Sequence, residues 1–302
     1  MTWNGKRFDW TNVVYFTALH LGALGALFTF SWPALLVCFA LCWVSASLGI
    51  GVTFHRLLTH RGFKTPKLVE YVGTVYGMLA SQGGAITWVA MHRAHHQLSD
   101  RPGRDLHTPK DGFWWSHIGW VLCKMDEDRR AFERLHAPEL VADPVHRVLN
   151  RIHVVPNVLV GLALYAWGGW SFVFWGVFLR MVVVLHATWF VNSAAHTWGY
   201  RTYDTPEGST NLWWVGLIAW GEGWHNNHHA FQRSARHGQE WWELDLNWLA
   251  IRALSALGLA QEIKLLPENA DRFRLPRPEV STAQPSAESA MSWAGPAGRS
   301  QS

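Results

Sequence analysis

Long stretches of apolar residues with almost no charge dominate two parts of the chain. They cover residues 13–30, 34–54, 152–167 and 170–192. Each stretch approaches or exceeds the ~20 residues that a helix needs to cross a ~30 Å hydrocarbon core. The short segments Ser31-Trp32-Pro33 and Gly168-Gly169 separate the members of each pair. This pattern predicts an all-α integral membrane protein with four transmembrane helices arranged as two hairpins.

The distribution of lysine and arginine predicts the orientation of these helices. Neither hairpin turn contains a basic residue, whereas Lys6 and Arg7 precede the first hairpin and many basic residues follow each hairpin. Because short basic segments stay on the cytoplasmic side, we expect both termini and a helical cap to be cytoplasmic. Residues 71–91 are also apolar, but no change of charge requires them to cross. We expect them to form a re-entrant or surface-lying element.

Composition agrees with a membrane location. Hydrophobic residues make up 49% of the chain and charged residues 16%, against about 25% charged residues in soluble domains. The 21 tryptophans belong to a residue type enriched at membrane–water interfaces, which argues against a tryptophan-rich soluble core. The net charge of +4 is not clustered, so no nucleic-acid partner is indicated. We expect a membrane domain over residues 1–275 and a disordered Pro/Ser/Ala/Gly-rich tail over residues 276–302.

Histidines gather in three short boxes whose spacing indicates a metal site. Eight of the 17 histidines belong to these boxes, and a ninth candidate, His196, follows the fourth apolar stretch. The box histidines are His55, His60, His92, His95, His96, His225, His228 and His229. In the second and third boxes, spacings of three and four residues put the histidines on one helical face, while adjacent histidines point about 100° apart. Such a pair can reach two metals, so the spacing predicts a binuclear site.

The first box differs from the other two. His55 and His60 are five residues apart and do not align on a regular α-helix, so we expect the helix to end or distort between them. All nine histidines lie just outside the predicted spans. Imidazole is a good ligand for iron, zinc and copper, and the spacing alone permits zinc. A histidine-rich membrane metal transporter is an alternative of another class, although transporters place such groups near the membrane midplane.

Five longer motifs extend the pattern beyond the histidines. They are FHRLLTHRGF, WVAMHRAHH, GFWWSHIGW, ATWFVNSAAHTWGYRTYD and GEGWHNNHH. Over residues 52–266 the chain resembles the membrane-bound fatty-acid desaturases, in particular the Δ9 group. The resemblance implies that the nine histidines bind two iron ions and that Asn192 contacts one iron through water. It also implies an acyl tunnel whose bend is lined by Gln82, Trp88, Thr188 and Trp189.

The resemblance also implies the reaction. Such an enzyme uses O₂ and two external electrons to introduce a cis double bond, here at Δ9, into a saturated fatty-acyl chain. No side chain can oxidise an unactivated methylene, so a redox metal must do so, and we expect no catalytic residue beyond the metal ligands. A di-iron lipid hydroxylase or alkane monooxygenase is the alternative enzyme. We expect a separate electron donor, either ferredoxin, rubredoxin or a cytochrome with its reductase, and CoA, a carrier protein or a glycerolipid as acyl carrier.

A few polar residues have more than one interpretation. Arg180 lies inside an apolar stretch, where a charge is costly and usually faces the bundle interior. We favour structural pairing over a catalytic role for it. His20 and His186 are expected to pack or form hydrogen bonds within the spans. Glu222, which precedes the third box, is a candidate either to orient a ligand histidine or to lie on the surface.

Overall fold

The computed structural model of the chain describes residues 1–125 and 128–276, which are mostly helical. The first half contains α1 (Trp10–Leu24), η1 (Gly25–Phe28), α2 (Trp32–Cys42), η2 (Trp43–Thr59), α3 (Lys67–Met78), α4 (Ala85–Leu98), η3 (Pro109–Asp111), α5 (Phe113–His117), η4 (Gly119–Leu122), α6 (Arg129–His136), α7 (Pro138–Ala142) and α8 (Pro144–Arg151). The second half contains α9 (Val155–Val173), η5 (Phe174–Leu179), α10 (Arg180–Ser193), η6 (Ala194–His196), α11 (Trp213–Ile218), α12 (His225–Ala230), α13 (Leu246–Ala256) and η7 (Ala270–Phe273). The tail predicted for residues 276–302 lies outside the described residues, apart from Pro276.

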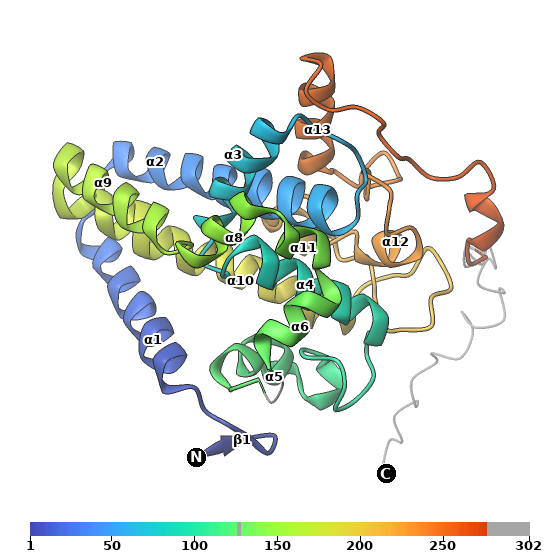
Figure 1. The fold of residues 1–302 in the computed structure, drawn as a ribbon, viewed down its shortest axis with the longest axis horizontal. Helices are drawn as coiled ribbons and strands as arrows, with labels where there is room; N and C mark the ends of the chain where they lie inside the picture. Colours follow the sequence, from blue (N-terminus) through green and yellow to red (C-terminus); the bar gives the residue numbers. More distant parts are fainter. Residues whose placement is uncertain (126–127, 277–302) are drawn as a thin grey trace, which may run out of the picture.

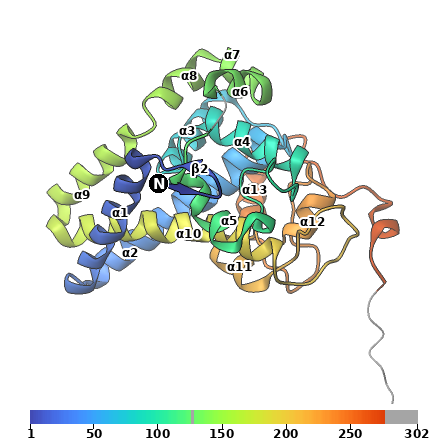
Figure 2. The ribbon, with the colours of Figure 1, turned by 90° about the horizontal axis from the view of Figure 1, so that it is seen from below.

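The helices divide into an elongated bundle and a more compact region. Helices α1, α2 and α9 extend to one side of the molecule, and α12 and α13 lie toward the other side (Figure 1). The second view shows the same division, with α6, α7 and α8 forming a separate layer beside α4 (Figure 2). The histidine boxes lie on α4, α12 and the end of η2, at the end of the bundle that meets the compact region.

The expectation of an all-α chain is wrong at the N-terminus. Strands β1 (Thr2–Trp3) and β2 (Lys6–Arg7) form an antiparallel hairpin. Asn4 and Gly5 connect them with φ angles of +49° and +76°. Two-residue hairpin turns with positive φ at both positions strongly favour Asn-Gly, so this dipeptide was the signal for a hairpin.

Three helical stretches are long and apolar enough to cross a membrane. They are Trp10–Phe28, Trp32–Thr59 and Val155–His196, of 19, 28 and 42 residues. The third stretch is about twice the length that one crossing needs. It contains a non-helical residue, Gly169, with φ +64° and ψ −155°, at the turn predicted from the sequence.

The two halves of this third stretch fold back on each other. A side-chain nitrogen of Arg180 donates to Asn157 Oδ1 over 2.8 Å. Closer to the turn, a Cβ added at Gly176 would lie 2.6 Å from Leu164 Cδ1, so Gly176 permits close packing. Both pairs are nearly symmetric about Gly169, as in an antiparallel helical hairpin. A membrane protein with apolar, mostly helical segments is therefore established.

Arg180 has a structural role in this hairpin, as we favoured from the sequence. Its side chain is completely buried. It donates to the carbonyls of Gly176 and Leu79 and to the side chain of Asn157. A buried guanidinium is tolerated only when its donors have partners. Through Leu79 and Asn157, Arg180 joins the end of α3 to both halves of the hairpin.

His20 and His186 form hydrogen bonds within the bundle, as expected. Their Nε2 atoms lie 3.0 Å apart. His186 Nδ1 lies 2.9 Å from His117 Nε2, and His117 Nδ1 lies 3.0 Å from Ser193 Oγ. This chain of ring nitrogens connects α1, α10 and α5.

The segment carrying the first histidine box is a π-helix. It covers Trp43–Thr59, and the backbone N–H of His60 donates to His55 O over 3.1 Å. Hydrogen bonds from residue i+5 to residue i define the π-helix, so a spacing of five residues corresponds to one such hydrogen bond. The ring centroids of His55 and His60 are 4.8 Å apart. The expected distortion is confirmed, and it brings the two rings together.

The apolar segment 71–91 is divided between two helices. Helix α3 ends at Met78 and α4 begins at Ala85. Between them Ser81 and Gly83 have positive φ angles of +61° and +91°. Neither helix is among the stretches long and apolar enough to span a membrane. The break places the second histidine box on α4.

The conformation of Gly169 gives a test of the hairpin. Its φ and ψ angles lie in a region that is essentially restricted to glycine, and another residue there costs about 1–3 kcal/mol. Gly169→Val should therefore lower the melting temperature of the detergent-solubilised protein. Gly161→Ala is the control, because its added Cβ would meet only Val177 at an ordinary 3.6 Å. Equal melting temperatures for the two variants would contradict the strained turn.

Candidate metal centre

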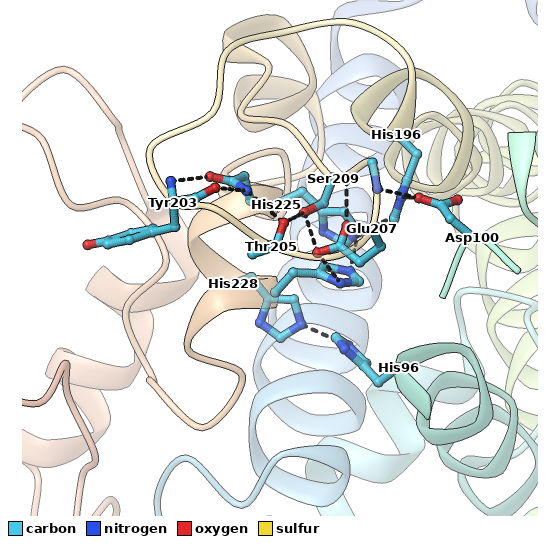
Figure 3. Close-up of polar contacts among 12 residues, drawn as sticks. His96, Asp100, His196, Tyr203, Thr205, Glu207, Ser209, His225 and His228 are labelled. Carbon is cyan, nitrogen blue, oxygen red and sulfur yellow. Dashed lines mark hydrogen bonds and ion pairs between the residues drawn. The ribbon is translucent and has the colours of Figure 1, made fainter. Parts of the chain in front are cut away.

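The structure brings the nine predicted histidines into two adjacent groups. The five-histidine group consists of His55, His60, His92, His96 and His228. The four-histidine group consists of His95, His196, His225 and His229. Within each group, one ring nitrogen from every histidine lies within 4.8 Å of all the others. The groups combine residues that are far apart in the sequence, as Figure 3 shows for His96 on α4 and His228 on α12.

Adjacent histidines in a box belong to different groups. His95 and His96 are split between the two groups, and so are His228 and His229. In contrast, histidines four residues apart, such as His92 and His96, stay in the same group. This agrees with the helical geometry that predicted a binuclear site.

The ring nitrogens converge in a way that hydrogen bonds alone do not explain. In the five-histidine group, His228 Nε2 lies 3.1 Å from His55 Nε2 and 3.0 Å from His96 Nε2. His96 Nε2 also lies 3.0 Å from His92 Nε2. Each ring nitrogen of a neutral imidazole has either one N–H or one in-plane lone pair, so it cannot direct a good hydrogen bond at two neighbours at once. Lone pairs directed at a common point account for this arrangement.

The spacing of these nitrogens fits a metal ion. A metal–imidazole bond is about 2.1 Å, so neighbouring ligands of an octahedral ion lie about 3.0 Å apart and those of a tetrahedral ion about 3.4 Å apart. In the four-histidine group, His225 Nε2 lies 3.0 Å from His196 Nε2 and 3.1 Å from His229 Nε2. Spacings of about 3 Å are therefore those of nitrogens that can bind one metal ion, in the one group as in the other.

Four carboxylates hold the other ring nitrogen of four histidines. His95 Nδ1 lies 3.0 Å from Asp105, and His196 Nδ1 lies 2.9 Å from Asp100 (Figure 3). The corresponding pairs are His55 with Glu222 and, at 3.5 Å, His229 with Glu207. A carboxylate that accepts from Nδ1–H fixes the tautomer and leaves the Nε2 lone pair available to a metal. Two positions were expected for Glu222, beside a box histidine or on the surface. The structure places it beside His55.

The buried charges around the histidines also suit two divalent ions. The side chains of Asp100, Asp105, Glu207 and Glu222 are at most 11% exposed. The one guanidinium among them, Arg56, bridges Glu222 and Asp245, so Asp245 offsets its charge. The four remaining negative charges equal the charge of two divalent cations. Such buried charges need compensation, which two metal ions would supply.

Burial keeps most of the histidines in the form that binds metals. It lowers the pKa of His60, His92, His96, His225, His228 and His229 well below the ordinary value. For His95, burial also acts to lower the pKa, but Asp105 outweighs it and the net shift is upward. Burial acts to raise the pKa of Asp105, yet His95 and His107 bring it below the ordinary range. Asp105 is therefore a carboxylate at neutral pH.

The predicted substrate residues occupy two different places. Trp88 Nε1 donates to Gln82 Oε1 over 2.9 Å, and Gln82 Nε2 donates to Thr188 Oγ1 over 2.8 Å. The Trp88 ring also stacks on His92, with centroids 4.9 Å apart. Three of the four residues are thus linked by hydrogen bonds in a series that reaches the five-histidine group. Trp189 is buried elsewhere, against Phe16.

Asn192 lies at the end of α10, four residues before His196. Its side chain is partly buried, and its backbone carbonyl accepts a hydrogen bond from Ser116. No hydrogen bond between its side chain and a histidine is found among the described residues. A contact through water, which the resemblance implies for Asn192, is a proposal considered below.

Several residues of the site were not assigned a role from the sequence. Asp100, Asp105 and Glu207 were missed, although two of them follow the second box by only a few residues. The asparagines of the third box are structural. Asn226 Oδ1 accepts from the backbone N–H groups of Thr202 and Tyr203 (Figure 3). These hydrogen bonds fix the short helix α12 against the loop that carries Glu207.

His237 also lies beside the five-histidine group. Its ring centroid is 4.4 Å from that of His228, and its Nδ1 lies 3.5 Å from Glu222. Both of its ring nitrogens are buried without a hydrogen bond. Its position outside the three boxes explains why sequence spacing did not identify it.

With this geometry established, comparison with known proteins decides the family. The fatty acid desaturase family model matches residues 30–262. The chain belongs to the fatty acid desaturase family. It is thus an oxidoreductase of fatty-acyl chains, and the resemblance drawn from the motifs is confirmed.

Three relatives illustrate the range of this family. The chain is 50% identical over 261 residues to the sn-1 stearoyl-lipid 9-desaturase of Anabaena variabilis, covering 86% of this chain and 95% of that protein. It is 46% identical over 263 residues to the protein of the same description from Synechocystis, covering 86% and 82%. It is 45% identical over 275 residues to the icosanoyl-CoA 5-desaturase of Limnanthes douglasii, covering 90% and 76%.

The carboxylates give a test of the metal centre that does not depend on turnover. Asp100 accepts from His196 Nδ1 and from the backbone N–H of Gly208. Asp100→Asn removes its charge and weakens its hold on the His196 tautomer, so metal affinity should fall by about 10–100-fold. Competition with a chelator measures this change. Asp204→Asn, in the loop that carries Gly208, is the control, because that side chain is 83% exposed. Unchanged affinity in Asp100→Asn would contradict the orienting role.

Proposed function

We propose that the chain is a di-iron acyl-lipid desaturase that introduces a cis double bond at Δ9 of a saturated acyl chain. Convergence of nine histidines into two groups is the observation on which this proposal chiefly depends. The charge of the four carboxylates supports two divalent ions, and the oxidation of an unactivated methylene favours iron over zinc, because zinc has no redox chemistry. The relatives named as stearoyl-lipid 9-desaturases support the substrate and the bond position.

The proposed ligand sets follow the two groups. One iron would be held by His55, His60, His92, His96 and His228, and the other by His95, His196, His225 and His229, with Asn192 contributing through water. When bound, the iron pair would activate O₂ to remove hydrogen from an unactivated methylene. The carboxylates would hold the Nδ1 protons and keep each ring in its orientation.

The protein's own contribution to the reaction is to position the acyl chain. We assign this role to Gln82, Trp88 and Thr188, because this hydrogen-bonded series reaches His92, and to Trp189, the residue after Thr188 on α10. One –CH₂–CH₂– unit, O₂, two protons and two electrons would give one cis –CH=CH– unit and two water molecules. The carbon chain loses two electrons, so the other two that O₂ requires come from a separate electron donor.

We also propose four membrane spans with both termini and the metal centre on the cytoplasmic side. The antiparallel packing around Gly169 supports two crossings within Val155–His196. The absence of lysine and arginine from both hairpin turns supports the orientation. The desaturase domain would extend over residues 1–275.

Lipid analysis tests the proposed reaction. Expression in a host without Δ9 monoenes should produce cis-9 acyl chains in glycerolipids, identified by mass spectrometry of derivatised fatty acids. His228→Ala should abolish the product and reduce the iron content, because it removes a ligand from the five-histidine group. If the wild-type protein carries two irons and forms no cis-monoene, the proposed reaction is wrong. A hydroxylated product would indicate a lipid hydroxylase, and product from acyl-CoA alone would refute the glycerolipid carrier.

Accessibility of single cysteines tests the topology. With the natural cysteines replaced, a cysteine at Trp167, which is 71% exposed beside the turn, should react with an impermeant thiol reagent from the outside of intact cells. A cysteine at Asp204, which is exposed near the metal centre, should react only after the membrane is opened. Labelling of both positions from the same side would rule out the proposed four-span arrangement.

A further inference from the structure

Two openings at the protein surface reach the histidine groups. The larger has a volume of about 470 Å³ and is lined by His60 and His96 of the five-histidine group. The smaller has a volume of about 290 Å³ and is lined by His229 of the four-histidine group. Gln232 and Arg233 line both openings. A single surface centred on Arg233 therefore gives access to both groups.

Cations surround these openings. Arg61, Arg93 and Arg233 line the larger one. Lys264 donates to the backbone carbonyl of Arg61, and both burial and the nearby charge of Arg233 lower the pKa of Lys264, so it lies at the same place. We call Arg61, Arg93, Arg233 and Lys264 the basic rim.

The basic rim keeps a net positive charge. Glu139 pairs with both Arg61, at 2.8 Å, and Arg93, at 2.6 Å. The neighbouring Lys64 and Glu262 pair with each other at 2.7 Å. Among the described residues Arg233 has no ion pair, and its side chain is exposed. Four cations against Glu139 leave a surplus of three positive charges beside the metal centre.

The residues proposed to position the acyl chain lie elsewhere. The hydrogen-bonded series Trp88, Gln82 and Thr188 reaches the five-histidine group at His92. His92 lines neither opening. The rim is thus available to another reactant. If the proposed function is correct, two electrons must arrive from outside for each double bond, and electron transfer is fastest over a short distance.

We propose that the basic rim is the docking surface for a small acidic protein that carries one electron at a time. Two molecules of the reduced carrier would dock in turn, each losing one electron, and His60, His96 and His229 would be the histidines nearest to it. This inference rests on the proposed function and identifies the partner of the same site. A positive surface next to the centre would accelerate encounter with an acidic carrier at low ionic strength.

Charge reversal at Arg233 tests the docking surface. The probe is a reduced plant-type [2Fe–2S] ferredoxin, supplied to the full-length, iron-loaded protein in nanodiscs of neutral lipid with a saturated acyl substrate. Arg233→Glu should raise the KM for ferredoxin by about tenfold or more at low salt with little change in kcat. The difference should shrink at ~0.5 M salt, where surface charges are screened. Arg233→Lys should retain the low KM.

Arg252→Glu is the matched control. Arg252 is an exposed arginine on α13 that lines neither opening, so its reversal changes the net charge equally and should leave the KM for ferredoxin unchanged. The docking proposal fails if Arg233→Glu and the double variant Arg61→Glu/Arg233→Glu both keep the wild-type KM. It also fails if Arg233→Glu loses binding to anionic vesicles while the KM stays constant, because the rim would then bind lipid head groups.

Reduction by dithionite separates this proposal from the proposed function. Dithionite bypasses docking, so a single turnover of the chemically reduced wild-type protein should form cis-monoene. If it does and the KM is insensitive to Arg233→Glu, only the docking surface is wrong. If it forms none, the desaturase reaction itself is wrong. The Arg233→Glu variant should also form cis-monoene when dithionite reduces it. If it forms none, the defect of this variant lies in folding or metal loading, and the docking explanation is overturned.

Discussion

The arrangement of the site depends on one electrostatic constraint, which is that lone pairs and negative charges are gathered in a buried region. Nine imidazoles meet, and seven of them have a ring nitrogen about 3 Å from that of another, while four carboxylates surround them. Without compensation, such a collection would be unfavourable. Two divalent metal ions satisfy both conditions at once, because they accept the lone pairs and balance the carboxylates. Bound metal would therefore contribute to the stability of the fold as well as to its chemistry.

This constraint explains two unusual features of the backbone. In the π-helix Trp43–Thr59 each hydrogen bond joins residues that are five apart, which is also the separation of His55 and His60. In an α-helix residues five apart point in different directions. At the other end of the site, α12 is only six residues long and could not be stable alone. Asn211 Oδ1 accepts from the N–H of Asn226, and Asn226 accepts from the adjoining loop, so polar side chains supply the stability that length does not.

The sequence predicted the features of the site that depend on local spacing. Histidines at i, i+3 and i+4 on a helix have a fixed relative orientation, so the division of His95 and His96 between two groups followed from the sequence. The apolar stretches and Gly169 predicted the helical hairpin for the same reason. The carboxylates could not be predicted in this way, because Asp100 and Glu207 reach the histidines through loops whose course depends on tertiary contacts. The N-terminal hairpin was predictable from Asn4-Gly5, but the apolar pattern that follows it directed attention to helices.

The two sides of the metal centre differ in chemistry, and this difference accounts for how one site can serve two unlike reactants. On one side, Trp88 stacks on His92 and connects through Gln82 to α10, within the helices that carry the apolar surface. On the other side, His60, His96 and His229 border openings lined by arginine and glutamine. An acyl chain has no favourable interaction with the second surface, and a water-soluble redox protein has none with the first. Because histidines of the same group face both surfaces, the proposed electron donor and the acyl substrate would reach the metal centre without competing for the same space.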